Sequence, residues 1–138
     1  MMRLLVASFC VALVLPVAAE DPKDPTKTAF QKLSFEKAIE KAKTEKKIVM
    51  VDFYADWCGP CKAMDAKTFA VDNVGKFLRD KTIAVKINID DNKALAAKHK
   101  ITAIPCLVFL DGEGKEVGRI LGFREAPKFL EEAEKIVK

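Results

Sequence analysis

The stretch over residues 48–55, Ile-Val-Met-Val-Asp-Phe-Tyr-Ala, is the feature that most constrains the fold. It is apolar at odd and even positions alike, apart from the carboxylate of Asp52. A strand that is apolar on both faces is covered on both sides, as happens when helices pack on the two faces of an α/β sheet. The segment therefore predicts a central strand of such a sheet.

Helical and strand patterns alternate along the rest of the chain. Ser34 is typical of an N-cap before apolar residues at helical spacing, and Pro127 is typical of the first turn of a last helix. Further helices are expected over residues 58–69, 72–79 and 92–100, and strands over 82–89, 106–110 and 116–121, with a short edge strand over 30–33. Strands separated by helices run parallel, and the final hairpin adds antiparallel edges. The predicted fold class is α/β, with a central mixed sheet of four or five strands flanked by helices on both faces.

The N-terminus has the pattern of a secretory signal peptide. Arg3 precedes an apolar run over residues 4–15, and small residues lead up to Ala19. The alternative is an uncleaved membrane anchor, but a span needs roughly 20 apolar residues, and Pro16 interrupts this run. We expect a signal peptide over residues 1–19, a flexible leader over 20–29 and one domain over 30–138.

The charge balance gives no reason to expect nucleic-acid binding. Lys and Arg total 24 against 20 acidic residues, and the basic residues form no stripe. The cysteines are more informative. Of four, Cys10 would leave with the signal peptide, and the remaining three cannot form a fully paired disulfide framework within one chain.

Two of those cysteines lie in the segment Trp57-Cys58-Gly59-Pro60-Cys61-Lys62, which directly follows the apolar strand. Cys58 at the start of a helix would face unpaired backbone N–H groups and the positive end of the helix dipole, which stabilise a nucleophilic thiolate. Cys61, one helical turn later, could resolve a mixed disulfide with a substrate. The alternatives are an inert disulfide, or a zinc site completed by Cys106 and His99 without the usual ligand spacing. We expect no metal.

The segment over residues 57–62 resembles the active-site signature of the thioredoxin family. The resemblance extends to further positions at which members of that family have similar residues, namely Val51–Ala55, Lys86–Asp90, Ile104-Pro105 and Gly122. The similarity covers residues 35–137. Tyr54-Ala55-Asp56-Trp57, Thr68-Phe69 and the longer stretch before Lys86 are most similar to the periplasmic C-terminal domain of transmembrane thiol-disulfide interchange reductases.

The resemblance implies roles for two charged residues. Asp52 would be buried, with a raised pKa, and would exchange a proton with Cys61, while Lys86 would lie near that carboxylate and modulate it. The alternatives are an Asp52 that turns outward at the strand end and a Lys86 that is a solvated edge charge.

The resemblance also implies a substrate-binding surface of Trp57, Gly59, Pro60, Ile104, Pro105 and Gly122. In the family the bond before the equivalent of Pro105 is cis, and the backbone there pairs with an extended substrate. The alternative is a trans proline that starts an edge strand.

Cys106 departs from the family pattern, which usually has threonine after this proline. It is either a small buried filler or a third redox sulfur close to Cys58. His99 is expected at a helix C-terminus, where it interacts with the helix dipole and has no catalytic role.

The resemblance implies an exported thiol-disulfide oxidoreductase that works as a monomer without a cofactor. It would be periplasmic in a bacterium, or otherwise secreted, and would reduce disulfides of substrate proteins through a Cys58/Cys61 cycle. A membrane-bound donor would re-reduce the pair. The alternatives are an oxidase or isomerase, a reductant for cytochrome c maturation, and a non-catalytic module that binds clients.

Overall fold

The computed structural model describes residues 29–138. The predicted signal peptide and almost all of the predicted leader lie outside the described residues. The expected division into residues 1–19, 20–29 and 30–138 therefore stays a prediction.

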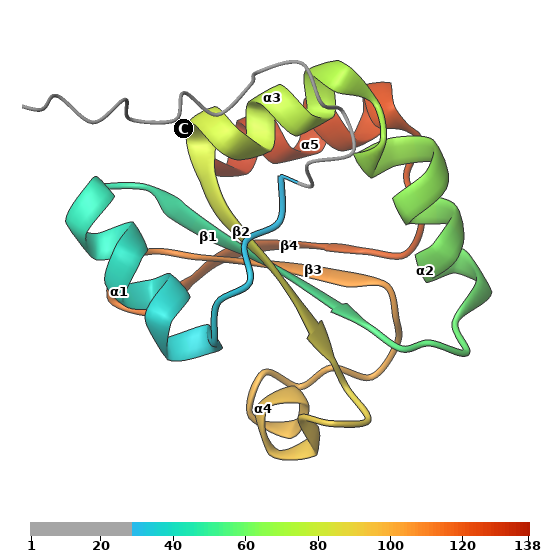
Figure 1. Ribbon diagram of the computed structural model, residues 1–138, viewed down its shortest axis with the longest axis horizontal. Coiled ribbons are helices and arrows are strands. Elements are labelled where there is room, and N and C mark those ends of the chain that lie inside the picture. The colour runs from blue at the N-terminus through green and yellow to red at the C-terminus, as the bar shows by residue number, and fades with distance from the viewer. Residues whose placement is uncertain (1–28) are drawn as a thin grey trace, which may run out of the picture.

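The described chain forms a four-stranded sheet with helices on both faces (Figure 1). The elements in chain order are α1 (Phe35–Glu45), β1 (Ile48–Tyr54), α2 (Gly59–Met64), the π-helical turn η1 (Asp65–Phe69), α3 (Asp72–Lys81), β2 (Thr82–Asn88), α4 (Lys93–Lys98), β3 (Cys106–Leu110), β4 (Glu116–Leu121) and α5 (Ala126–Ile136). The predicted N-cap is confirmed, because the Ser34 hydroxyl accepts a hydrogen bond from the Lys37 backbone nitrogen at 3.2 Å. Within residues 29–138, none of the helices has the length and apolar character needed to cross a membrane.

The strand order is β2-β1-β3-β4. β1 and β2 run parallel, as expected for strands separated by helices. β3 and β4 form the predicted antiparallel hairpin, but β3 is no edge strand, because it also pairs with β1, again antiparallel. α4 has six residues and lies beyond the end of β2, so the chain enters β3 from the end of the sheet at which it left β2 (Figure 1). The edge strand expected over residues 30–33 is reduced to an isolated bridge between Phe30 and Ala84.

Both faces of β1 are buried, as its sequence predicted. Val49, Val51 and Phe53 pack on the face covered by α1. Met50 packs on the other face with residues of α2, α3 and α5. Full burial of one such side chain contributes about 1.5–3 kcal/mol, so β1 is anchored by the two hydrophobic cores.

A third, small cluster lies where β1 ends. Ala55, Cys58 and Cys61 are buried there, and Ile104 from the loop before β3 packs against them. The two cores thus hold the end of β1 in place, and the cysteines follow directly from it.

Candidate active site

Cys58 and Cys61 form a disulfide at the beginning of α2. Their Cα atoms lie 5.3 Å apart. Cys58 is the N-cap residue, and its Sγ accepts a hydrogen bond from the Cys61 backbone nitrogen at 3.2 Å. Pro60 occupies the first turn, where the missing N–H of proline costs no helical hydrogen bond. After reduction, a thiolate on Cys58 would receive the same N–H group and the positive end of the helix dipole.

Asp52 lies in β1, six residues before Cys58, and is 2 % exposed. Its Oδ2 atom accepts a hydrogen bond from Lys86 Nζ at 2.8 Å. Its Oδ1 atom has no hydrogen-bond partner within the described part of the chain. Burial raises the pKa of Asp52, and Lys86 offsets part of this rise. The alternative of an outward-turning Asp52 is therefore wrong.

Lys86 lies in β2, directly opposite Asp52 in the parallel pair. Its Nζ also contacts Asp65 Oδ1 at 2.6 Å and lies 4.7 Å from the centre of the Tyr54 ring. The rings of Phe30 and Phe69 lie at 5.0 and 5.7 Å. Burial tends to lower the pKa of Lys86, but the two carboxylates outweigh it and the pKa is raised. Lys86 is therefore a cation fixed by ion pairs with Asp52 and Asp65, and the alternative of a solvated edge charge is wrong.

Asp65 was not singled out from the sequence. It begins η1 and stands four residues after Cys61, so helical spacing could have placed it on the same side of the helix. Its contact with Lys86 spans 21 residues and depends on how the helix packs on β2.

Among the residues predicted to bind substrate, Ile104 packs against the buried cysteines. The Ile104–Pro105 peptide bond is cis, so the alternative of a trans proline is wrong. The Gly122 nitrogen donates to the Pro105 carbonyl at 2.8 Å, which joins the two loops. Trp57 is 68 % exposed beside the cysteines, and its Nε1 donates to Asp90 Oδ2 at 2.9 Å.

Gly59 and Pro60, which stand between the two cysteines, are also exposed. No heavy atom lies within 4 Å of where a Cβ on Gly59 would be. The surface next to the disulfide is therefore open to a partner molecule.

Cys106 is a free thiol that is 1 % exposed. It packs in the core cluster that contains Phe53, on the face covered by α1. Burial raises the pKa of Cys106, although Arg119 Nη1 lies 4.0 Å from its Sγ. A buried, protonated thiol is a weak nucleophile, which favours the interpretation of Cys106 as a filler.

His99 follows the last residue of α4, as expected. Its ring packs against Phe35 and Phe53, with ring centres 5.2 and 6.0 Å apart. Burial lowers the pKa of His99 and favours its neutral form, which weakens the expected interaction with the helix dipole. In the described residues no three His, Cys, Asp or Glu side chains are grouped so that they could hold a metal ion.

Comparison with known proteins decides the family. The sequence model of the Thioredoxin family matches residues 26–135, which is most of the chain. The chain belongs to the thioredoxin family. The Cys58–Cys61 disulfide at its helix N-terminus is the redox-active pair of a thioredoxin-like thiol-disulfide oxidoreductase.

Relatives within the family include both thioredoxins and larger proteins. The thiol:disulfide interchange protein DsbD of Photorhabdus laumondii is 37 % identical over 98 residues, which are 67 % of this chain and 17 % of that protein. A thioredoxin of Echinococcus granulosus is 36 % identical over 64 % of this chain and 78 % of its own length. Thioredoxin-T of Drosophila melanogaster is 37 % identical, and the match spans 41 % of its length. The chain thus spans less than half the length of DsbD and of Thioredoxin-T.

Solved structures of the thioredoxin family share the architecture. The oxidised C-terminal domain of Neisseria meningitidis DsbD is 29 % identical with a TM-score of 0.63, over 77 % of this chain and 96 % of that one. An oxidoreductase named DsbH superposes with a TM-score of 0.71 over 95 % of this chain and 94 % of its own, at 22 % identity, which shows the shared fold.

Proposed function

We propose that this chain is exported and reduces the disulfides of substrate proteins, with Cys58 as the nucleophile and Cys61 as the resolving thiol. The observation that carries the assignment of roles is the position of Cys58 as the N-cap of α2, where its sulfur accepts the Cys61 N–H. A thiolate is stabilised there. The Gly59-Pro60 dipeptide between the cysteines, which resembles that of reducing thioredoxins, supports the reductive direction.

The cycle begins with the reduced pair. The Cys58 thiolate attacks one sulfur of the substrate disulfide, and the other substrate sulfur leaves as a thiolate. Cys61 then loses its proton and attacks the Cys58 sulfur, which releases the second substrate thiolate. Two electrons pass from the dithiol to the substrate, and the Cys58–Cys61 disulfide remains. A membrane-bound donor would return two electrons to it.

Asp52 is proposed to take the proton from Cys61, and Lys86 to modulate the acidity of Asp52. Two observations support these roles. Asp52 is buried with a raised pKa, so it can hold a proton at a pH where an exposed carboxylate would not. The Lys86 ammonium, at 2.8 Å, prevents that pKa from rising further.

The proposed substrate surface consists of Trp57, Gly59, Pro60, Ile104, Pro105 and Gly122. Its support is the bond between the loops that contain Pro105 and Gly122, together with the exposure of Trp57. An extended substrate segment could pair with backbone groups there. A monomer would leave this surface uncovered.

The experiment that tests the exchange reaction is substrate trapping with Cys61→Ser in the native compartment. The variant should accumulate mixed disulfides between Cys58 and client proteins, because the resolving step is removed. A Cys58→Ser, Cys61→Ser variant is the control and should trap none. Absence of mixed disulfides with Cys61→Ser, or client binding that is unchanged in the double variant, would favour a non-catalytic binding module.

Direction and export have tests of their own. Equilibration with glutathione should give a reduction potential closer to about −270 mV, as in thioredoxin, than to about −120 mV, as in a strong oxidant. A potential near the second value would indicate an oxidase. N-terminal sequencing of the exported protein should begin at Glu20, and an uncleaved chain in the cytoplasm would contradict export. If apocytochrome c dominates the trapped clients, the protein is a reductant specialised for cytochrome c maturation.

A further inference from the structure

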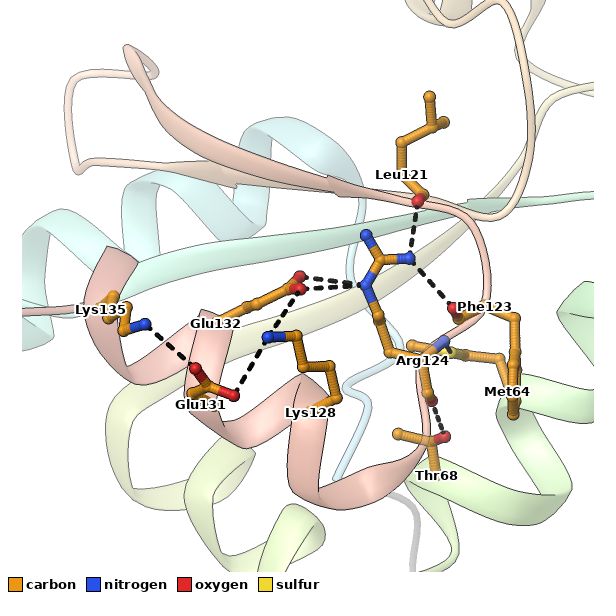
Figure 2. A network of polar contacts seen from close by, with 9 residues as sticks. All are labelled: Met64, Thr68, Leu121, Phe123, Arg124, Lys128, Glu131, Glu132 and Lys135. Atoms are coloured by element: carbon orange, nitrogen blue, oxygen red, sulfur yellow. Dashed lines mark hydrogen bonds and ion pairs between the residues drawn. The ribbon is translucent and has the colours of Figure 1, made fainter.

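The turn between β4 and α5, residues 122–125, is bonded to the helix that contains the cysteines. The Arg124 backbone nitrogen donates to Met64 Sδ at 3.4 Å, and Met64 is the last residue of α2. The Arg124 carbonyl accepts a hydrogen bond from the Thr68 hydroxyl in η1 (Figure 2). Met64 and Thr68 are 1 % and 0 % exposed. The turn is therefore connected to the buried side of the helical segment that begins at Cys58.

The Arg124 side chain also forms hydrogen bonds with the backbone of this turn and of the residue before it. Its Nη1 donates to the carbonyls of Leu121 and Phe123 at 3.0 and 3.1 Å, on either side of Gly122 (Figure 2). Its Nε contacts the Glu132 carboxylate in α5 at 3.1 and 3.2 Å. Hydrogen bonds from a charged donor are stronger than neutral ones. One guanidinium thus bonds two carbonyls of the turn and is itself anchored on α5.

Gly122, between those two carbonyls, has a φ of +86°, a conformation that glycine adopts without steric cost. Its nitrogen donates to the Pro105 carbonyl. Arg124 is therefore bonded to the helical segment that follows Cys58 and to α5, and the Gly122 turn that it holds is bonded to the loop containing Pro105.

We propose that Arg124 is a positioning residue for protein substrates, because it holds the Gly122 turn in register with Pro105 and the disulfide. This inference rests on the proposed reduction of protein disulfides. An extended polypeptide must pair with the loop backbone and present its sulfur to Cys58 at the same time, so a loosened turn weakens its binding. A small disulfide reaches Cys58 without pairing with the turn.

The test uses the full chain with three substitutions. Arg124→Met keeps the aliphatic stem and removes every side-chain donor, while the backbone bonds to Met64 and Thr68 stay available. Arg124→Lys keeps the charge, but its single nitrogen cannot make all the bonds that the Arg124 guanidinium makes to the two carbonyls and to Glu132. Lys128→Met is the matched control, because Lys128 contacts Glu131 at 3.1 Å and Glu132 at 4.0 Å but no residue of the turn in the contacts described (Figure 2).

KM and kcat are measured for insulin, as a protein disulfide, and for hydroxyethyl disulfide, with dithiothreitol as the donor. Arg124→Met should raise KM for insulin about tenfold, the factor that corresponds to loss of one charge-assisted hydrogen bond. Its kcat for insulin and its rate with hydroxyethyl disulfide should change less than about twofold. Arg124→Lys should lie between Arg124→Met and the original chain, and Lys128→Met should match the original.

A second measurement, amide exchange by NMR, reads the turn directly. The Gly122 amide, protected by its bond to Pro105, should exchange about tenfold faster in Arg124→Met than in Lys128→Met. If Arg124→Met does not fold, Arg124→Lys is compared with Lys128→Met on both measurements and should show a smaller change of the same sign.

The outcomes separate two failures. If the original chain reduces neither substrate, the proposed function is overturned and this inference with it. If the original chain reduces both but the substitutions at Arg124 leave KM for insulin unchanged, or slow both substrates equally, the positioning role is overturned and the proposed function stands.

Discussion

The buried carboxylate of Asp52 is predicted to lower the stability of the folded protein at neutral and alkaline pH. One oxygen accepts a hydrogen bond from Lys86, while the other has no partner within residues 29–138. Because burial raises the pKa of Asp52 above its ordinary value of 3.8, the folded state binds this proton more tightly than the unfolded state. Stability is therefore lost as the pH rises from 3.8 through the raised pKa.

Asp52→Asn removes the charge and keeps an oxygen that can accept from Lys86. Lys86 is not left unpaired, because Asp65 contacts it at 2.6 Å. Desolvation of a buried carboxylate costs several kcal/mol, and the raised pKa of Asp52 shows that Lys86 offsets only part of this cost, so removal of the charge should be stabilising. One polar atom of Asn remains without a partner, which places the expected gain in the free energy of unfolding at about 2 kcal/mol near pH 8. The gain should be smaller near pH 4, because the folded protein holds this proton more readily as the pH falls toward the raised pKa of Asp52.

The assay is urea unfolding of the oxidised protein near both pH values, followed by fluorescence of Trp57, the one tryptophan of the chain. Asp65→Asn is the control. It removes the other carboxylate that contacts Lys86. Because the Asp65 side chain is 49 % exposed, the free energy of unfolding should change by less than about 1 kcal/mol. An equal gain for Asp52→Asn near both pH values, or a loss near pH 8, would refute the reasoning.

Three further substitutions have defined outcomes. Lys86→Met leaves the Asp52 carboxylate buried without its cation and should lower the free energy of unfolding near pH 8 by about 3 kcal/mol in the same urea assay. Cys106→Ser should change the reduction potential of the active-site disulfide by less than about 15 mV in glutathione equilibration, since the thiol is buried and its pKa is raised; a larger change would favour the third redox sulfur. Thr68→Val removes the buried hydroxyl that donates to the carbonyl of Arg124 and should cost about 1–2 kcal/mol, whereas Thr68→Ser should keep most of that stability.

Short-range features were the ones that could be predicted well. The both-face apolar run became β1, and Ser34 became the N-cap of α1. Cys58 and Cys61 are three residues apart at a helix start, a spacing that brings their Cα atoms to 5.3 Å once the helix forms. Each of these depends on backbone geometry within one or two turns, so the chain encodes it locally.

Long-range contacts were harder to predict. β3 runs antiparallel to β1 because the short helix α4 lies beyond the end of β2 and does not return the chain to the opposite end of the sheet. The second carboxylate on Lys86, Asp65, is 21 residues distant, and the contacts of Arg124 with Met64 and Thr68 join residues 60 and 56 positions apart. No local pattern marks such pairs.

Local patterns along the chain specify the strand, the helix start and the reactive pair, because these depend on alternation, capping and the length of a helical turn. Tertiary packing is what places Lys86 against Asp52 and the Arg124 guanidinium against the carbonyl of Leu121. Those pairings arise when helices pack on a sheet and bring distant segments within hydrogen-bond reach, and burial then sets how strongly the paired charges act on each other.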